Sequence, residues 1–175
     1  MMNMNSQYIP LYKTIILYLL KSSETPLSKA QIMDFMLESA YTSFLVLQEV
    51  FSELVEQRLV REEEDASRTY LFITRVGEDT LEALKDGIRE DILLQADKFL
   101  EENKHRIRNE ASLRSSYHGL SSGSYEVHLE VNERGRSIFE ISIEVPSKEA
   151  AVKACDEWEK ISGDLYQYTI KKLLL

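Results

Sequence analysis

The segment from Leu59 to Leu81, LVREEEDASRTYLFITRVGEDTL, most constrains what the N-terminal half of this chain can form. Two strand-like runs flank a polar turn, which is the pattern of a β-hairpin. Thr74 follows the second run, and a threonine before an amphipathic stretch is a typical helix cap. The sequence therefore predicts a hairpin that leads directly into a helix.

Three helices are expected before this hairpin. The first carries Pro10 in its first turn, where proline is tolerated. The second begins at Ser28, which opens a capping-box pattern. The third begins at Thr42 or Ser43 and ends near Gln57. Helix, helix-turn-helix, hairpin and helix is the order of a winged helix-turn-helix domain.

The second half changes its hydrophobic period. Helical spacing over 88–107 gives way to a period of two in ASLRSSYH, SYEVHLEV and SIFEISIEV, and Ser147 can cap a last helix. The predicted fold is α+β in two domains. A winged helix-turn-helix spans 8–87, and a dimerisation or sensing module spans 88–175. That module comprises a long helix, a three-stranded antiparallel sheet and a C-terminal helix.

Charge bears on whether the first domain reads DNA. The net charge is −9, and residues 1–87 hold 8 lysines and arginines against 14 aspartates and glutamates. DNA readers draw much of their affinity from basic contacts to phosphate. A third helix in the major groove could pair a glutamine with adenine. The expected DNA contacts are Lys29, Thr42, Ser43, Gln48, Arg61, Arg68 and Arg75, with Lys13 or Lys21 as a further phosphate clamp.

The hairpin carries four consecutive acids, from Glu62 to Asp65, and the third helix has no lysine or arginine. Because strand side chains alternate, the four acids cannot all face DNA. They can equally form a solvated edge that discourages strand pairing. The alternative function is a protein–protein interaction module without DNA binding, docking a partner through the apolar surface from Phe44 to Leu47. A positively charged face on the third helix and hairpin favours DNA binding. An exposed apolar patch without such a face favours the protein–protein interaction module.

No catalytic constellation is present, so we do not expect an enzyme. The sequence has no phosphate loop, dinucleotide fingerprint, nucleophile elbow or His-Glu-x-x-His motif. Cys155 lies on an apolar stripe, which indicates a buried thiol. His105, His118 and His128 match no zinc spacing, although His118 and His128 share the polar phase of neighbouring strands, where a metal pair or proton relay is conceivable. We expect no cofactor and no metal.

Cysteine content and apolar surface indicate location and partners. The single cysteine fits a reducing cytoplasm. The longest apolar run, from Ile15 to Leu20, is far shorter than the roughly 20 residues of a membrane span. The long helix and the final helix offer more apolar surface than one sheet covers, which predicts a homodimer. The polar face of that sheet is either open to solvent or lines a polar site between subunits, and no small-molecule effector can be identified.

The segment SELVEQRLVREEEDASRTYLFITRVGEDTLEAL resembles the wing of bacterial winged-helix regulators. The matching positions are Leu54, Leu59, Val60, Tyr70, Ile73, Thr74, Gly77 and Leu81, whereas Arg58 replaces the usual glycine. PLYKTIILYLL, YTSF and VPSKEAAVKACDEWEK resemble a clostridial domain-of-unknown-function family described as winged-helix transcriptional regulators, from about Ile9 to Leu174. The resemblance implies a transcriptional regulator, and it carries over no operator, ligand or catalytic residue. Together with the predicted dimer, we expect a regulator that binds DNA as a homodimer through its winged helix-turn-helix.

Overall fold

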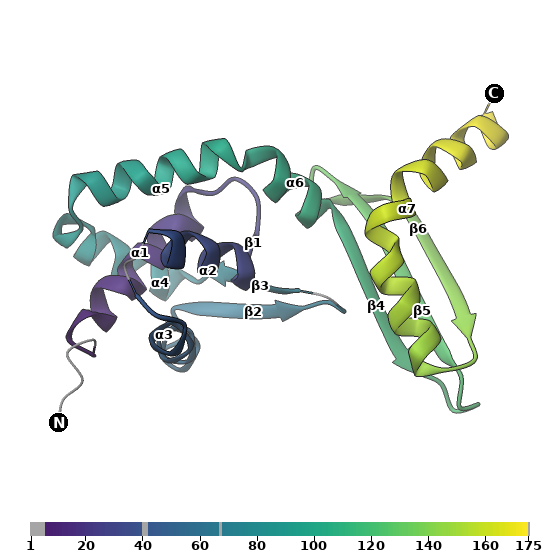
Figure 1. The fold of residues 1–175 in the computed structure, drawn as a ribbon, viewed down its shortest axis with the longest axis horizontal. Helices are drawn as coiled ribbons and strands as arrows, with labels where there is room; N and C mark the ends of the chain where they lie inside the picture. Colours follow the sequence, from purple (N-terminus) through teal and green to yellow (C-terminus); the bar gives the residue numbers. More distant parts are fainter. Residues whose placement is uncertain (1–5, 40–41, 67, 175) are drawn as a thin grey trace. The chain divides into compact units, whose positions relative to one another are not determined.

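The computed structural model describes residues 6–39, 42–66 and 68–174, and the chain divides into two compact units (Figure 1). The N-terminal unit comprises Met1–Glu63 and Arg68–Ile107, and the C-terminal unit comprises Glu64–Ser67 and Arg108–Leu175. Each contains one three-stranded sheet, so the fold is α+β, as predicted. No helix in the described ranges is both long and apolar enough to cross a membrane.

The N-terminal unit is built mainly from helices around a small sheet of order β1-β3-β2. Strand β1 pairs antiparallel with β3, with Leu27 opposite Leu71. A strand of two residues is too short to show a period of two in the sequence. The elements in chain order are η1 (Ser6–Tyr8), α1 (Ile9–Ser22), β1 (Leu27–Ser28), α2 (Lys29–Glu38), α3 (Phe44–Glu56), β2 (Val60–Glu64), β3 (Thr69–Ile73), α4 (Arg75–Leu84), η2 (Lys85–Gly87), α5 (Glu90–Glu102) and α6 (Lys104–Ser112).

The helix starts are fixed by side-chain caps. Ser28 caps α2 in a full capping box, with Gln31 N–H donating to Ser28 Oγ at 3.2 Å and Ser28 N–H donating to Gln31 Oε1 at 2.9 Å. Ser43, rather than Thr42, caps α3. Thr74 caps α4 by accepting from Gly77 N–H at 3.1 Å. The predicted starts of these three helices are thereby confirmed.

The end of α3 and the start of α4 meet at the carbonyl of Leu59. Arg58 has φ 58°, the left-handed conformation that usually ends a helix at glycine. The turn is closed by Leu59 N–H donating to Leu54 O and by Arg58 N–H donating to Val55 O, both at 2.9 Å. Leu59 O then accepts from Thr74 N–H at 3.0 Å. A Cβ on Gly77 would lie 2.1 Å from this oxygen, so only glycine fits there.

The long helix predicted over 88–107 is two helices, α5 and α6, separated at Asn103. The Asn103 side chain donates to Phe99 O at 2.8 Å, and a side-chain amide bonded to this carbonyl favours a helix end. Along α5, the buried residues Ile92, Ala96 and Phe99 belong to the core of the N-terminal unit. Phe99 packs against Phe35 of α2, with ring centroids 5.2 Å apart. The compact units therefore divide after Ile107, whereas the sequence placed the boundary after Gly87.

The C-terminal unit is an antiparallel sheet of order β4-β5-β6 with one long helix packed on it. Strand β4 spans Leu113–Gly119, β5 spans Tyr125–Glu133, β6 spans Arg136–Val145, and α7 spans Lys148–Leu174. The predicted three strands and final helix are confirmed, except that the predicted first two residues of β4 end α6.

The core of this unit lies between the inner face of the sheet and α7. Trp158 is buried, and its Nε1–H donates to Glu130 O at 3.1 Å. Ala66 N–H donates to Ser115 O at 2.8 Å, so the hairpin turn also hydrogen-bonds within this unit. The buried residues of its hydrophobic cluster are Val127, Leu129, Ala151, Cys155 and Trp158.

Candidate functional site

The outward side of α3 carries exposed apolar residues at its N-terminal end. Its inner side buries Leu47, Val50, Phe51 and Leu54, and Val46 packs partly buried against the same core, so the opposite side of the helix points outward. On that outward side Phe44 is 54% exposed and Leu45 is 79% exposed. Exposed apolar side chains placed together on one helix end are typical of a surface that binds another protein.

The polar residues of α3 are acidic or neutral. The helix spans FLVLQEVFSELVE and contains Glu49, Glu53 and Glu56 but no lysine or arginine. Gln48 is half-buried, whereas Glu49 is exposed. A helix lying in the major groove comes close to phosphates on both sides, so these carboxylates oppose such a position electrostatically. The exposed side of α3 thus carries apolar and acidic residues.

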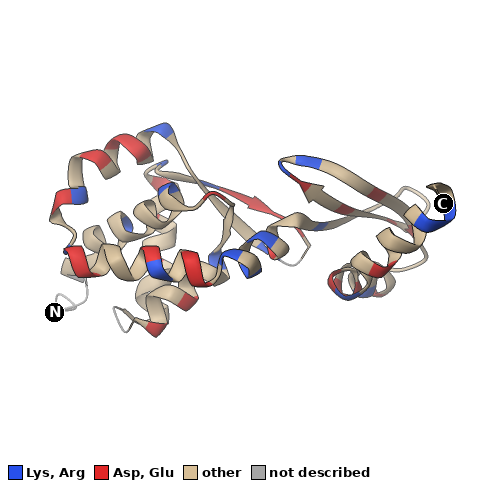
Figure 2. Ribbon diagram, turned by 90° about the horizontal axis from the view of Figure 1, so that it is seen from above, with Lys and Arg blue, Asp and Glu red and all other residues tan. Residues whose placement is uncertain are grey.

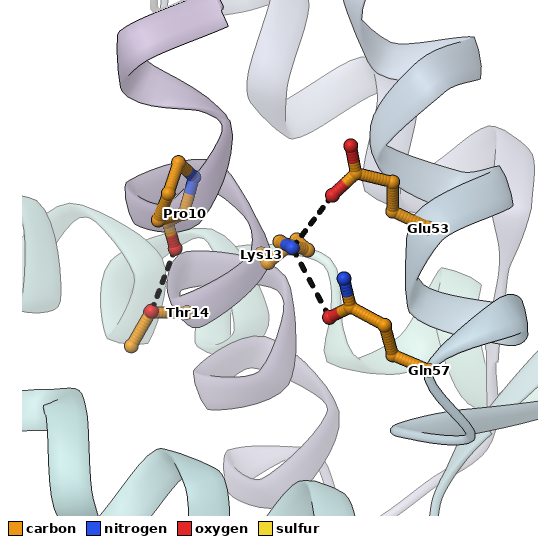
Figure 3. Close-up of polar contacts among 5 residues, drawn as sticks. All are labelled: Pro10, Lys13, Thr14, Glu53 and Gln57. Atoms are coloured by element: carbon orange, nitrogen blue, oxygen red, sulfur yellow. Dashed lines mark hydrogen bonds and ion pairs between the residues drawn. The ribbon is translucent and has the colours of Figure 1, made fainter.

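Lys13 and Lys21, which could have offset the negative charge of α3, are paired with acidic residues inside the N-terminal unit. Lys13 of α1 donates to Glu53 Oε2 at 2.7 Å and to Gln57 Oε1 at 3.2 Å (Figure 3). In the same turn of α1, Thr14 Oγ1 donates to Pro10 O at 2.8 Å. Lys21 lies 2.6 Å from Glu78 Oε1 of α4. These lysines therefore join α1 to neighbouring helices instead of presenting positive charge to a ligand.

The acidic run of β2 pairs with two of the predicted DNA contacts. Glu62 Oε1 lies 2.7 Å from Lys29 Nζ, which also lies 5.1 Å from the centroid of the Phe51 ring. Glu63 forms an ion pair with Arg61, whose guanidinium lies 4.3 Å from the centroid of the Phe72 ring. Figure 2 shows lysine and arginine in blue and aspartate and glutamate in red along the ribbon. Lys29 and Arg61 thus interact with carboxylates of β2 and with aromatic rings of their own unit.

The other predicted DNA contacts have mixed positions. Ser43 uses its hydroxyl to accept from Val46 N–H as the cap of α3, at 3.5 Å. Thr42 and Arg68 are half-buried. Arg75 is exposed at the first position of α4. Of the four basic residues among the seven predicted contacts, Arg61 and Arg75 are exposed, and their binding to phosphate stays a prediction.

Polar side chains cover the outer face of the C-terminal sheet, and we call this surface the outer polar face. The strand register places Arg114, Glu130 and Glu140 side by side, then Ser116, His128 and Ser142, then His118, Glu126 and Glu144. Strand pairing is what brings these nine residues together. The sequence predicted their shared polar phase on each strand but could not align one strand with the next, because alignment depends on the hairpin lengths.

Two histidines of the outer polar face each pair with a glutamate. His118 Nε2 lies 3.2 Å from Glu126 Oε2, and His128 Nε2 lies 3.3 Å from Glu140 Oε1. The other ring nitrogen of His128 lies 3.0 Å from Ser142 Oγ. In both pairs the histidine nitrogen lies within hydrogen-bonding distance of the glutamate oxygen, and both pairs lie on the solvent side of the sheet.

Cys155 is a buried thiol in the core of the C-terminal unit, as the sequence predicted. Burial raises the pKa of this thiol, and a hydrogen bond with Ser115 opposes that rise. A thiol that stays protonated is a poor nucleophile, so Cys155 contributes packing.

The comparisons with known proteins identify one family. Neither a curated protein nor a solved structure matches the chain. A family model described as Domain of unknown function (DUF4364) matches residues 12–173. Because this match covers both units, the chain belongs to the DUF4364 family of domains of unknown function.

Proposed function

We propose that the N-terminal unit is a winged helix-turn-helix that acts as a protein docking module, with α3 as the contact surface. The order α1, β1, α2, α3, β2, β3 and the sheet order β1-β3-β2 support the winged-helix assignment, with β2 and β3 as the wing. In this scaffold α3 is the helix presented to a ligand. Its surface chemistry therefore decides between nucleic acid and protein.

The observation that carries the docking proposal is the composition of the exposed side of α3. Phe44 and Leu45 supply apolar area, and burying it on a partner is favourable by about 25 cal/mol per Å². DNA offers no comparable apolar surface in its grooves beyond the thymine methyl groups. The absence of basic residues from α3 removes the main source of nucleic-acid affinity.

Charge complementarity defines the partner. The patch of Phe44 and Leu45 is followed along α3 by Glu49, Glu53 and Glu56. Among the residues that the structure describes, Glu53 is the one of these three that pairs with a lysine, Lys13 of α1. A matching protein surface has an apolar centre and a basic rim, because opposite charges across an interface steer association and reject acidic competitors. The partner is therefore a basic protein, and association should slow as salt concentration rises.

The second candidate function is the DNA-binding transcriptional regulator expected from the sequence. It is favoured by the winged-helix order and by the exposed Arg75 at the start of α4, next to the wing. It requires Lys29 and Arg61 to leave their ion pairs with Glu62 and Glu63 and to contact phosphate instead. That exchange weakens binding, because each released carboxylate then lies near the DNA.

Self-association through α7 is the remaining part of the proposal. The helix has 27 residues and so is about 40 Å long, whereas the nine residues of β5 span about 30 Å. Its fully buried residues end at Ser162, and beyond them Tyr168, Leu173 and Leu174 are exposed. A second copy related by a two-fold axis would cover these residues on both chains at once. The buried apolar stripe of α5 packs in its own unit, so we place the proposed contact on α7.

One pair of measurements separates protein from DNA as the ligand of α3. A photo-crosslinking amino acid placed at Ser52, exposed on α3, is expected to capture one defined basic protein in the source cells. The captured protein is then purified, and its dissociation constant with the full chain is measured directly. In parallel, the same chain is incubated with a pool of genomic fragments at low salt, and retained fragments are sequenced.

Leu45→Glu is the test variant, and Leu94→Glu is the matched control, because Leu94 is also an exposed leucine of the N-terminal unit. Leu45→Glu is expected to weaken partner binding at least about tenfold, as for loss of one apolar anchor, while Leu94→Glu leaves it unchanged. Sequence-selective retention of DNA that survives physiological salt would contradict the docking proposal and support the regulator instead. Equal binding by the Leu45→Glu and Leu94→Glu variants would also contradict it.

A further inference from the structure

Three ligand-type side chains of the outer polar face converge on one point. A nitrogen of His128 and carboxylate oxygens of Glu130 and Glu140 all lie within 4.8 Å of one another. His128 and Glu130 come from β5, and Glu140 comes from the edge strand β6. All three lie in the C-terminal unit, so this cluster is independent of the docking surface on α3.

The imidazole of His128 is oriented as a ligand. Its Nδ1 lies 3.0 Å from Ser142 Oγ, directly across the β5–β6 pair. With the proton on Nδ1, this contact leaves the lone pair of Nε2 directed toward Glu140. Metal-binding histidines are commonly held in this way by a hydrogen bond to the other ring nitrogen.

The spacing of one ligand pair matches a small tetrahedral ion. His128 Nε2 and Glu140 Oε1 are 3.3 Å apart. Zinc bonds of about 2.0 Å to nitrogen and 2.1 Å to oxygen span that separation at an angle of about 107°, close to the tetrahedral value. One imidazole with two carboxylates leaves a fourth position for water, which is the arrangement of an open zinc site.

Electrostatics give the cluster a reason to hold a cation. Glu130 and Glu140 are directly opposite each other in the strand register, and like charges in that position destabilise a sheet. Arg114 lies opposite Glu130 on its other side, in β4, and offsets part of the charge of Glu130. Glu140 is on the edge strand and has no neighbour beyond β6 in this sheet. A divalent ion between the two carboxylates removes their repulsion.

The second histidine of the outer polar face supplies an internal comparison. His118 pairs with Glu126, and Glu126 also lies opposite another glutamate, Glu144. The Glu144 carboxylate, however, accepts a hydrogen bond from Ser124. Within the described residues, only the cluster around His128 brings three ligand atoms together.

We propose that His128, Glu130 and Glu140 bind one divalent transition-metal ion of the zinc type on the outer face of the C-terminal sheet. The mixture of imidazole nitrogen and carboxylate oxygen suits zinc better than magnesium or calcium, which prefer all-oxygen sites. The site is open to solvent on one side, so the ion can exchange without unfolding of the sheet.

The test is zinc titration of the full chain, prepared without a histidine tag and stripped with a chelator. Calorimetry is expected to give one saturable zinc ion per chain at submillimolar concentration. His128→Gln and Glu140→Gln should each weaken zinc binding by more than about 100-fold, and Ser142→Ala by about tenfold as an outer-shell partner. Magnesium should not compete.

His118→Gln is the matched control, because it removes an equivalent His–Glu pair on the same face. It should leave zinc affinity unchanged. Glu140→Gln also has a second readout, since removing one of two opposed carboxylates should not lower the melting temperature of the metal-free chain while zinc no longer raises it. Absence of saturable zinc binding, or equal loss in the His118→Gln and His128→Gln variants, would overturn the proposal.

Discussion

Gly77→Ala should destabilise the N-terminal unit strongly, although alanine normally favours a helix. A Cβ at this position in α4 would lie 2.1 Å from Leu59 O and 2.9 Å from Ile73 Cγ1. The first contact is with backbone, so no side-chain rotation can relieve it. Restoring an ordinary separation of about 3.5 Å requires α4 and the start of β2 to move apart by about 1.4 Å.

The expected magnitude follows from what that movement disrupts. Leu59 O accepts from Thr74 N–H and from Thr74 Oγ1, each at 3.0 Å, and both bonds would lengthen. Weakening two hydrogen bonds costs about 1 kcal/mol each, and overpacking costs about 2 kcal/mol. The higher helix propensity of alanine offsets about 1 kcal/mol of this loss. The net loss in free energy of unfolding is therefore about 3 kcal/mol.

Urea denaturation followed by far-ultraviolet circular dichroism measures this loss as a lower transition midpoint. Gly87→Ala is the control in the same unit, because a Cβ at Gly87 meets nothing within 4 Å. The control should change stability by less than about 0.5 kcal/mol, as is usual for surface substitutions. A loss below about 1 kcal/mol for Gly77→Ala would refute the close approach of α4 to Leu59.

Four further outcomes follow from the structure. Arg58→Gly should raise the free energy of unfolding by about 1 kcal/mol in urea denaturation, because glycine adopts a φ of 58° without strain. Gly163→Ala in α7 should also raise it by about 1 kcal/mol, since a Cβ there meets nothing within 4 Å. Glu62→Lys with Glu63→Lys should increase salt-sensitive, non-specific DNA binding in a filter assay by releasing the ion-paired bases. Burial raises the pKa of the Cys155 thiol above its unfolded value of 9.0. The stability that the protonated thiol contributes is therefore complete below pH 9.0 and is lost as the pH rises through the folded pKa. Cys155→Ser should consequently reduce the fall in the free energy of unfolding at alkaline pH.

The sequence predicted the local elements well because their signals are local. The capping box at Ser28, the cap at Thr74 and the alternation in the three C-terminal strands each depend on residues a few positions apart. Packing partners depend on distant residues, and there the predictions were weaker. The stripe of α5 indicated burial but not its partner, and the ring that covers Phe99 belongs to Phe35, far earlier in the chain.

The outer polar face was likewise predicted from local alternation, whereas the cluster on it depends on residues of two different strands. The sequence predicted one polar face on this sheet, but not which of its side chains meet. Only the pairing of Glu130 with Glu140 and of His128 with Ser142 shows that a histidine and two carboxylates meet at one point. That register is set by the hairpin between β5 and β6, including the irregularity after Val131. No spacing motif within either strand could have indicated the cluster.

The acidic run of β2 explains why total charge did not decide the function of the N-terminal unit. Alternation along the strand means that adjacent glutamates point to opposite sides. Glu62 pairs with Lys29 of α2, and its neighbour Glu63 pairs with Arg61. The run is therefore compatible with a stable hairpin, and it lowers the positive potential of the basic side chains that a DNA-binding protein would use.

What then distinguishes the surface of the N-terminal unit is the apolar end of α3, where Phe44 and Leu45 are exposed. Local pairing, more than net charge, thus favours a protein over nucleic acid as the ligand of α3.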